Sequence, residues 1–347
     1  MPSIAANMGE EVRESPAVVR RQEALLAEPV AALVKRIAAC RPRLVMTCAR
    51  GSSTHAAKFA KHVFERYLGI PVAAAAPNIA TQYHRSLDLD GQLFLSISQS
   101  GRSDDLVETA LMARRAGALT VSLVNDPASP LARASELVLP LCAGPELSVA
   151  ATKSFVASLA ALMRIVAAWS DDPVLHEACA SLPDRLAAAS LLDWSAALAP
   201  LAQANSVVTI GRGPTFAIAY EAALKLKETC ELHAEAFSAA EFRHGPIALV
   251  SAAYPVLVFQ PNDEAGSGFT DLAGDLQRIG GCVLVAGGVD VGVAQGSNRL
   301  PALAPQQPEA DAICLIQSFY GLLATLAACR GTDADQPRHL QKVTRTR

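Results

Sequence analysis

Short apolar runs alternate along the chain with longer segments whose apolar residues recur at helical spacing. The first run, at residues 44–48, leads into a segment with apolar residues on one helical face that ends at Gly69. Further runs of strand length lie at 93–97, 119–124 and 137–141, with helical segments between them. Strands that alternate with helices form parallel sheets covered on both faces, so the pattern predicts an α/β fold.

Three features of the first half recur in the same order in the second half. The first feature is an Arg-Gly pair after the first strand, at Arg50 and again at Arg212. The other two are later strands: 93–97 corresponds to 255–259, and 119–124 corresponds to 282–285. Repetition in order at one spacing indicates a duplicated domain. The sequence therefore predicts two tandem α/β domains of the flavodoxin-like or Rossmann-like type, each a parallel sheet between helical layers.

The remaining segments complete the predicted domain organisation, which suits a chain of 347 residues because one core rarely serves so many. The expected segments are an N-terminal helical segment at 1–38 with one helical stretch from about Ser15 to Ala38, a first domain at 39–170, a helical connection at 171–204, a second domain at 205–330 and a polar tail at 331–347.

Composition and charge narrow the class of protein. The formal net charge is −3, from 30 basic and 33 acidic residues, which is not the basic footprint of a nucleic-acid-binding protein. The uncharged run between Asp311 and Arg330 approaches the length of a membrane span, but Gln317, Ser318 and Tyr320 interrupt it and favour a buried helix. No Cys-x-x-Cys pair occurs among the eight cysteines, so we expect buried thiols in a reducing compartment. The N-terminus has no signal-peptide pattern, and we expect a cytoplasmic protein without a membrane partner.

Hydroxyl side chains gather where two strands of the first domain end. Ser98, Gln99, Ser100 and Ser103 follow one strand and precede a helix, and Ser53 lies at another helix start. Ligands bind at the carboxyl ends of parallel strands, and a helix N-terminus attracts anions through its free N–H groups. This pattern favours a phosphate site, with an ordinary helix cap as the alternative. Neither phosphate-binding glycine motif of nucleotide enzymes occurs, which disfavours nucleotides.

The second domain has charged residues where the first has hydroxyl groups. Glu221, Lys225 and Glu228 recur at positions i, i+4 and i+7 and therefore share one helical face. A solvated face with ion pairs of ~0.2–0.5 kcal/mol is the alternative interpretation. His244 lies in a loop before a Gly-Pro break, where a histidine is suited to proton transfer near neutral pH or serves as a solvated cap.

Five separated motifs occur together in the order of a known family. They are Ser98 to Gly101, 143–146 with 151–153, 221–228, 241–246 and 335–338. The chain resembles the two-domain SIS (sugar isomerase) family, in particular the isomerase half of glucosamine-6-phosphate synthase, from about residue 40 to its end. The resemblance implies two tandem SIS domains, no metal or redox cofactor, and a homodimer with sugar-phosphate sites near the subunit interface.

The resemblance also implies a role for each candidate residue. The phosphate-binding residues would be Ser53, Ser98, Gln99, Ser100 and Ser103, with Val149 near the sugar hydroxyls. The catalytic residues would be Glu228, which moves a proton between sugar carbons C1 and C2, His244, which assists ring opening and reaches the partner's site, and Lys342, which forms a Schiff base with the ketose phosphate. Glu221 and Lys225 would support Glu228 from the same helix face.

The departures from the synthase suggest a different overall reaction. No counterpart of the glutaminase half precedes residue 40, the serine that follows the tail lysine is missing after Lys342, and Arg102 and Ala151 replace an acidic and a hydroxyl residue. We therefore expect isomerising deamination of glucosamine 6-phosphate to fructose 6-phosphate and ammonia. Two alternatives within the same class are a fructosamine-6-phosphate deglycase and a galactosamine-6-phosphate deaminase. An alternative of another class is a sugar-phosphate sensor without turnover.

Overall fold

The computed structural model describes residues 6–288 and 298–342 of the chain. Contacts divide it into two compact units, which we describe separately. The N-terminal unit comprises Ala17–Glu146, Lys153–Ala180 and Gln341–Arg347, and the C-terminal unit comprises Met1–Pro16, Leu147–Thr152 and Ser181–Leu340. Neither unit is one continuous segment, because helix α1 (Ala6–Leu25) and helix α8 (Pro173–Ala189) each contribute residues to both units.

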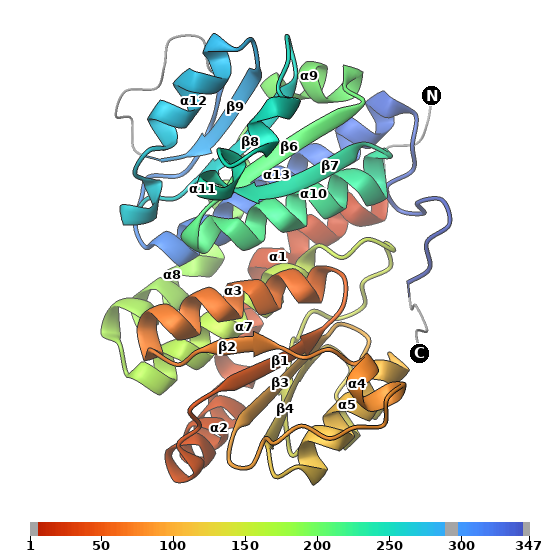
Figure 1. Cartoon of the computed structure of the whole chain (residues 1–347), viewed down its shortest axis with the longest axis vertical. Coiled ribbons are helices and arrows are strands. Elements are labelled where there is room, and N and C mark those ends of the chain that lie inside the picture. Colours follow the sequence, from red (N-terminus) through yellow and green to blue (C-terminus); the bar gives the residue numbers. More distant parts are fainter. Residues whose placement is uncertain (1–5, 289–297, 343–347) are drawn as a thin grey trace. The chain divides into compact units, whose positions relative to one another are not determined.

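The N-terminal unit is built on a parallel five-stranded sheet in the order β2-β1-β3-β4-β5. Its strands are β1 (Val45–Ala49), β2 (Val72–Ala74), β3 (Leu93–Ser98), β4 (Leu119–Val124) and β5 (Leu137–Pro140). Its helices besides parts of α1 and α8 are α2 (Ala27–Cys40), α3 (Ser52–Leu68), α4 (Asn78–Thr81), α5 (Asp104–Arg115), α6 (Pro130–Ala134) and α7 (Lys153–Ser170). Helices α3 and α7 pack together on one face of the sheet, and α5 covers the other face (Figure 1).

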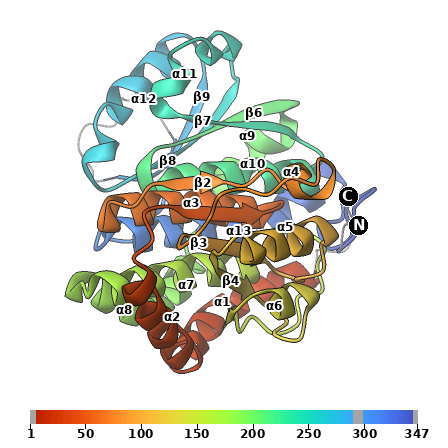
Figure 2. The same cartoon turned by 60° about the horizontal axis from the view of Figure 1, so that its bottom comes forward.

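The C-terminal unit contains a second parallel five-stranded sheet, in the order β10-β9-β8-β6-β7. Its strands are β6 (Ser206–Gly211), β7 (His233–Ser238), β8 (Pro255–Gln260), β9 (Cys282–Gly287) and β10 (Asn298–Leu300). Its helices are α9 (Leu198–Gln203), α10 (Phe216–Cys230), α11 (Ala239–Phe242), α12 (Phe269–Arg278) and α13 (Pro308–Arg330), with short 3₁₀ turns at Ser195–Ala197, Gly213–Thr215, Pro246–Leu249 and Glu264–Gly266. Figure 2 shows α11 and α12 on one side of this sheet and α10 on the other.

The two sheets confirm the predicted α/β fold with a repeated domain. Read from the other edge, the second sheet has the order β7-β6-β8-β9-β10, which is the order of the first sheet element for element. In each sheet the central strands are almost fully buried, as expected for a parallel sheet with helices on both faces.

Some elements differ from the sequence-based expectation. The strands β2, β7 and β10 were not predicted, because β2 and β10 have three residues each and β7 alternates exposed and buried residues at the sheet edge. The expected single helical stretch near the N-terminus is two helices, α1 and α2. Pro29 lies in the first turn of α2, where its missing N–H leaves no intrahelical bond unmade.

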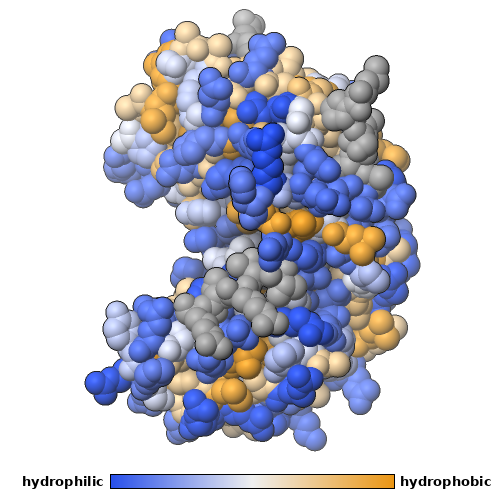
Figure 3. Space-filling view, turned by 90° about the vertical axis from the view of Figure 1, so that its right-hand side faces the viewer, coloured by the Kyte–Doolittle hydropathy of each residue, from blue (hydrophilic) through white to orange (hydrophobic). Residues whose placement is uncertain are grey.

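Two helices, α7 and α13, are long and apolar enough to cross a membrane by length and composition, but 78% of the most apolar window of each is buried inside the protein. Such burial is typical of core helices. The polar residues that interrupt α13 have partners within the fold: Gln317 donates to the Val12 carbonyl at 2.7 Å, and the Ser318 hydroxyl donates to the Ala189 carbonyl at 2.9 Å. Figure 3 shows a face on which hydrophilic residues cover most of the surface and hydrophobic residues form small, separate groups.

The cysteines follow the expectation of buried thiols only in part. Cys48, Cys179, Cys230 and Cys314 are buried, whereas Cys329 is exposed, and all eight thiols are free. Cys329 is in the last turn of α13, where the helix leaves the core before its C-terminal Gly331.

Candidate active site

The hydroxyl cluster of the N-terminal unit is the loop between the end of β3 and the start of α5, which we call the serine loop (98–103). The Ser98 hydroxyl accepts a hydrogen bond from the Gly101 N–H at 3.1 Å, and the Ser100 hydroxyl accepts one from the Arg102 N–H at 3.3 Å. Ser103 is the N-cap residue of α5 and its side chain makes no capping hydrogen bond. The ordinary helix cap, which was the alternative for this loop, is therefore not formed by Ser103.

Gly101 fixes the course of the serine loop. Its φ of +61° lies in the left-handed region, and a Cβ at this position would come within 2.2 Å of the Ser129 Oγ atom. The Gly101 carbonyl in turn accepts a hydrogen bond from the Leu131 N–H at 3.1 Å, at the start of α6. Only glycine satisfies the conformation and the space together, so the loop is held tightly against α6.

Two carboxylates near the serine loop are paired with arginines. Asp105 is buried in the first turn of α5 and forms an ion pair with Arg50, which follows β1, at 2.7 Å. Arg102 forms an exposed ion pair with Asp126 at 2.8 Å. The neutralised Asp105 removes part of the repulsion that a carboxylate at this position would exert on a bound phosphate. Ser53 is the second residue of α3, and Gly51 is the N-cap residue of this helix.

Asn125 joins the serine loop to a second loop, which carries a buried carboxylate. The Asn125 N–H donates to the Gln99 carbonyl at 3.2 Å, and its side-chain amide donates to the Gly144 carbonyl at 2.7 Å. Two residues further on, Glu146 accepts hydrogen bonds from the Ser154 N–H at 3.1 Å and from the Ser154 hydroxyl at 2.7 Å. This carboxylate is therefore held at the N-terminal end of α7.

Lys342 in the C-terminal tail lies against this carboxylate. Its ammonium nitrogen is 3.0 Å from the Glu146 Oε2 atom, and the Glu146 side chain is fully buried while the Lys342 side chain is 25% exposed. The serine loop, Asn125, Glu146 and Lys342 thus belong to one connected set of contacts within the N-terminal unit. The tail residues 343–347 lie outside the described residues.

The charged stripe on α10 forms a buried chain of contacts in the C-terminal unit. Lys225 pairs with Glu228, lies 3.5 Å from the Glu221 carboxylate, and is buried. The Tyr320 hydroxyl of α13 donates a hydrogen bond to Glu221 at 3.1 Å. The Glu228 side chain is 22% exposed, whereas those of Glu221 and Lys225 are almost completely buried. The stripe is therefore not the solvated face that was the alternative interpretation, and Glu228 is its accessible end.

His244 is exposed and stands apart from this chain of contacts. It follows α11, and its backbone N–H donates to the Glu241 carbonyl at 3.0 Å. Its imidazole makes no hydrogen bond or ion pair within residues 6–288 and 298–342, so the structure brings Glu221, Lys225 and Glu228 together without His244.

Val149 lies in the loop 147–152, which is held by hydrogen bonds to Glu11 and Asp335. Glu11 of α1 accepts hydrogen bonds from the N–H groups of Leu147 and Ser148. Asp335 accepts hydrogen bonds from the Ser148 hydroxyl at 3.0 Å and from the N–H of Met8, in the first turn of α1, at 2.8 Å. Its carbonyl accepts the Val149 N–H at 3.1 Å.

The sequence-based reasoning did not assign a role to several residues of these networks, namely Glu11, Asn125, Glu146, Tyr320 and Asp335. Glu146 and Asp335 lie within motifs that carried the resemblance, and Tyr320 is one of the polar residues in the apolar run of α13. Membership in these motifs and in this run was the signal that could have identified them. Their hydrogen-bond partners are remote in the sequence, and a periodic pattern does not reveal contacts between remote segments.

Comparisons with known proteins agree with this architecture. The SIS domain family matches residues 39–168 and 200–329. The isomerizing glutamine–fructose-6-phosphate aminotransferase of Bradyrhizobium diazoefficiens is 33% identical over 370 residues, which cover 96% of this chain and 58% of that relative. The chain thus spans little more than half the length of this curated relative.

Two solved structures are similar over almost the whole chain. A crystal structure described as a phosphosugar isomerase from Silicibacter pomeroyi DSS-3 has a TM-score of 0.89 at 40% identity and covers 95% of this chain and 99% of its own. The C-terminal domain of glucosamine-fructose-6-phosphate aminotransferase from Francisella tularensis has a TM-score of 0.84 at 27% identity and covers 95% of this chain and 98% of its own. The fold, the motifs and these relatives confirm the resemblance, and the chain belongs to the SIS domain family.

Proposed function

We propose that this protein catalyses the isomerising deamination of glucosamine 6-phosphate, with water as co-substrate and fructose 6-phosphate and ammonia as products. The single observation that carries the proposal is the pairing of Lys342 with the buried Glu146, 3.0 Å apart. A primary amine beside a buried carboxylate that can take up its proton is suited to imine chemistry, which a plain exchange between aldose and ketose does not require.

The serine loop is the proposed phosphate site. Ser98, Ser100 and Ser103 provide hydroxyl groups, Gln99 an amide, and the first turn of α5 its free N–H groups and the positive end of the helix dipole, with Ser53 contributing from the first turn of α3. The ion pair between Arg50 and Asp105 supports this role because it balances the charge of a buried carboxylate in the first turn of α5. Val149 is the proposed neighbour of the sugar hydroxyls.

Glu228 is the proposed proton carrier. Ring opening, assisted by His244, gives an aldehyde at C1 with the amino group at C2. Glu228 then removes the proton from C2 and returns one to C1, while a second proton passes from the amino nitrogen to the C1 oxygen, which converts the aldehyde and amine into a C1 hydroxyl and a C2 imine. Lys225, held by the buried Glu221, supports this step because its ion pair keeps the accessible carboxylate in place.

Lys342 is the proposed acceptor of the sugar imine. Its neutral amine adds to the C2 imine carbon, ammonia leaves, and a lysine-bound imine remains. Water adds to this imine and releases the C2 ketone together with the free amine of Lys342. The buried Glu146 is the proposed base for the protons that these steps move.

The first experiment measures ammonia and fructose 6-phosphate in the same tube from purified protein and glucosamine 6-phosphate. We expect equal formation of the two products and its loss, by a factor of about 10² or more, in Glu228→Gln. Lys227→Gln, an exposed position on the same helix, is the matched control and retains activity. Ammonia from galactosamine 6-phosphate alone, or products from a fructosamine 6-phosphate alone, would replace the proposed substrate, and saturable binding of these sugars with no turnover would replace the enzyme by a sensor.

The role of Lys342 has its own test. Borohydride reduction in the presence of fructose 6-phosphate should attach the sugar to the wild-type chain, as measured by intact mass, and leave Lys342→Ala unmodified and inactive. Substantial deamination by Lys342→Ala would contradict a covalent role and leave only an orienting one.

The homodimer with shared sites, the cytoplasmic location and the domain limits expected from the sequence stay part of the proposal. The exposed imidazole of His244 supports a role in the partner's site. Glu228→Gln and His244→Ala proteins, each inactive, should regain activity when their subunits are exchanged, because one composite site of a mixed dimer then has both groups. If exchange is demonstrated by sedimentation and activity does not return, His244 acts within its own subunit.

A further inference from the structure

We propose that the N-terminal unit has a second small-molecule site, which takes an organic monocarboxylate with an apolar body. The site is a cavity of about 330 Å³ between α1, α2, α7 and α8, which we call the Arg164 cavity. This volume is at the lower end of the range of ~300–1,000 Å³ found for small-molecule sites, so the ligand is small. The inference does not depend on the proposed reaction, because none of the serine-loop residues, Glu146 or Lys342 lines this cavity.

The guanidinium of Arg164 supplies the charge recognition. Its Nη2 atom donates to the Val19 carbonyl at 3.2 Å and to the Cys179 carbonyl at 3.5 Å, which fixes the group between α1 and α8. Its Nε atom is buried without a hydrogen-bond partner, and no carboxylate forms an ion pair with Arg164 in the part of the chain that the structure describes. A half-buried guanidinium with donors left over is suited to bind a carboxylate.

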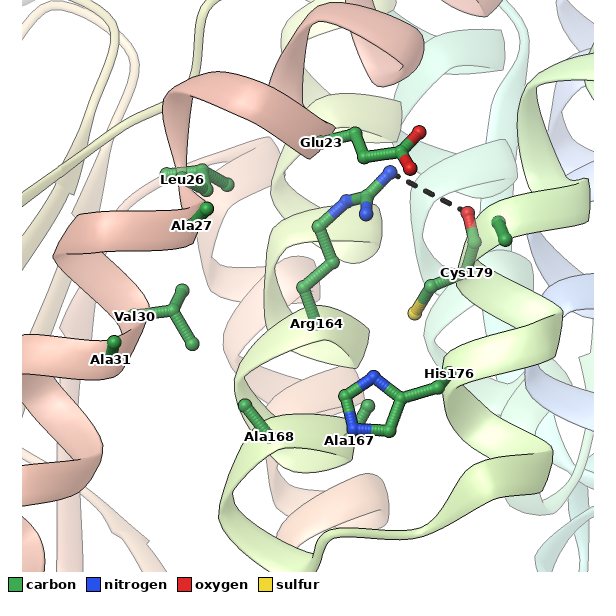
Figure 4. A pocket seen from close by; sticks show the side chains of 11 residues that line it. Glu23, Leu26, Ala27, Val30, Ala31, Arg164, Ala167, Ala168, His176 and Cys179 are labelled. Carbon is green, nitrogen blue, oxygen red and sulfur yellow. Dashed lines mark hydrogen bonds between the residues drawn. The ribbon is translucent and has the colours of Figure 1, made fainter.

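The walls of the cavity supply the apolar contacts. Figure 4 shows Leu26 and Val30 on one side of Arg164, from the end of α1 and from α2, and Cys179 on the other side, from α8. Burial raises the pKa of the Cys179 thiol to about 11, so this wall is uncharged near neutral pH. Ala167 and Ala168 form the floor along α7 and leave room above it. An aliphatic or aromatic body fits this lining better than a sugar.

The residues at the edge of the cavity restrict the charge of the ligand. Glu23 and His176 line it and are exposed, and Figure 4 shows the Glu23 carboxylate on the same side as the Arg164 guanidinium. A carboxylate at the edge repels a second negative charge, so a phosphate dianion or a sugar phosphate is disfavoured here. The Glu23 carboxylate therefore favours a ligand with no more than one negative charge, which Arg164 can bind.

Hexanoate is the probe for this site, with hexan-1-ol as the uncharged control of equal chain length. Saturation-transfer NMR on the full chain should show saturable binding of hexanoate, with hexan-1-ol at least tenfold weaker. Arg164→Met should weaken hexanoate binding at least tenfold, and Arg36→Met, an exposed arginine of α2, should leave it unchanged. Glu23→Gln should permit a dicarboxylate such as adipate to bind, which the wild-type chain excludes.

A second pair of variants keeps the test decisive if Arg164→Met does not fold. Ala31 lines the cavity from α2 and Ala32 does not, and both are exposed. Ala31→Phe fills the cavity without removing a hydrogen bond and should abolish hexanoate binding, whereas Ala32→Phe should retain it. Equal binding by these two variants, or equal binding of hexanoate and hexan-1-ol, would overturn the proposal. So would a loss of self-association in Ala31→Phe, seen by sedimentation, without any hexanoate binding by the wild type, because the cavity would then face a second copy of the chain.

Discussion

The two sheets share one strand order but present different groups at equivalent positions. Counted from the Arg-Gly pair that follows β1 and β6, Glu221 and Lys225 of α10 correspond to Phe59 and Val63 of α3. All four are buried. The same position in the same fold is therefore apolar in one copy and ionic in the other. The fold does not require the buried charges, which supports a chemical role for them, because apolar replacements of buried ion pairs are often neutral or stabilising.

The loops after the equivalent strands β3 and β8 show the opposite difference. The serine loop has three serine hydroxyl groups and a glycine, whereas β8 leads into Pro261 and Asn262. The Asn262 amide donates a hydrogen bond to Asp311 at 2.9 Å. Pro261 has no N–H to offer an anion. Duplication thus produced one unit with a candidate anion site after strand β3. The other unit has candidate proton-transfer residues on helix α10.

The largest effect on stability and turnover is expected when the cation of the α10 stripe is removed and its carboxylates remain. Lys225→Met leaves Glu221 buried without its cation, so we expect a loss of about 3–5 kcal/mol of unfolding free energy and a loss of turnover. Lys227→Met, on the exposed face, should change stability by less than about 0.5 kcal/mol. Urea denaturation and ammonia release measure the two properties.

A triple variant separates the chemical role of the stripe from a structural one. Glu221→Leu, Lys225→Met and Tyr320→Phe together give α10 an apolar face like that of α3 and remove both buried charges together with the hydroxyl group that binds Glu221. We expect stability equal to or above that of the wild type, with turnover still absent. If the triple variant is as unstable as Lys225→Met alone, the buried charges hold the fold of the C-terminal unit, and the comparison between α3 and α10 fails.

A smaller effect is expected in the serine loop. Gly101→Ala adds left-handed strain of about 1–2 kcal/mol and a contact with the Ser129 Oγ atom, so the loop must move. We expect KM for the sugar phosphate to rise about tenfold or more, with a smaller change in kcat. Gly69→Ala is the matched control, because Gly69 has a φ of +64° and no atom within 4 Å of the added Cβ. Equal KM values for the two variants would show that the loop does not bind the substrate.

Replacing Asp335 tests how much its contacts with α1 and with the loop 147–152 stabilise the C-terminal unit. Asp335→Asn removes the negative charge beside the first turn of α1 and weakens the hydrogen bonds from Met8 and Ser148. We expect a loss of about 1 kcal/mol, the usual effect of a lost helix cap. Asp333→Asn, which affects only local backbone bonds to Asp335 and Gln336, should cost less. Thermal unfolding measures the order of the two.

The sequence was sufficient for elements whose pattern is local, and insufficient for contacts between remote segments. The apolar runs that became β3, β4 and β8 carry their own signal because both faces of these strands are buried. Edge strands such as β7 bury alternate residues only, so a continuous apolar run does not mark them. The serine loop and the α10 stripe were identified because each is contiguous or helically periodic. The partners that give them meaning, Asn125, Tyr320 and Asp335, are distant in the sequence and are brought there only by the tertiary fold.

The last prediction compares buried thiols, which occur in each unit. Burial raises the pKa of Cys48 and Cys314 from the ordinary value of 9.0 to about 12. Because the folded-state pKa is raised, the stabilisation is complete below pH 9 and decreases as the pH rises from 9 towards 12, where the unfolded chain alone ionises these thiols. Each thiol should lower the unfolding free energy by about 1.4 kcal/mol between pH 8 and pH 10.

Replacing one of these thiols tests that dependence. Cys314→Ala should lower stability at pH 8 through lost packing and reduce the further loss between pH 8 and pH 10 by about 1.4 kcal/mol relative to the wild type. Cys329→Ala, which removes an exposed thiol from the same helix, is the control. Chemical denaturation at the two pH values gives the difference directly. An unchanged loss in Cys314→Ala would mean that water reaches this thiol in the folded state, and that the core of the C-terminal unit around α13 is less closely packed than that of its counterpart around Cys48.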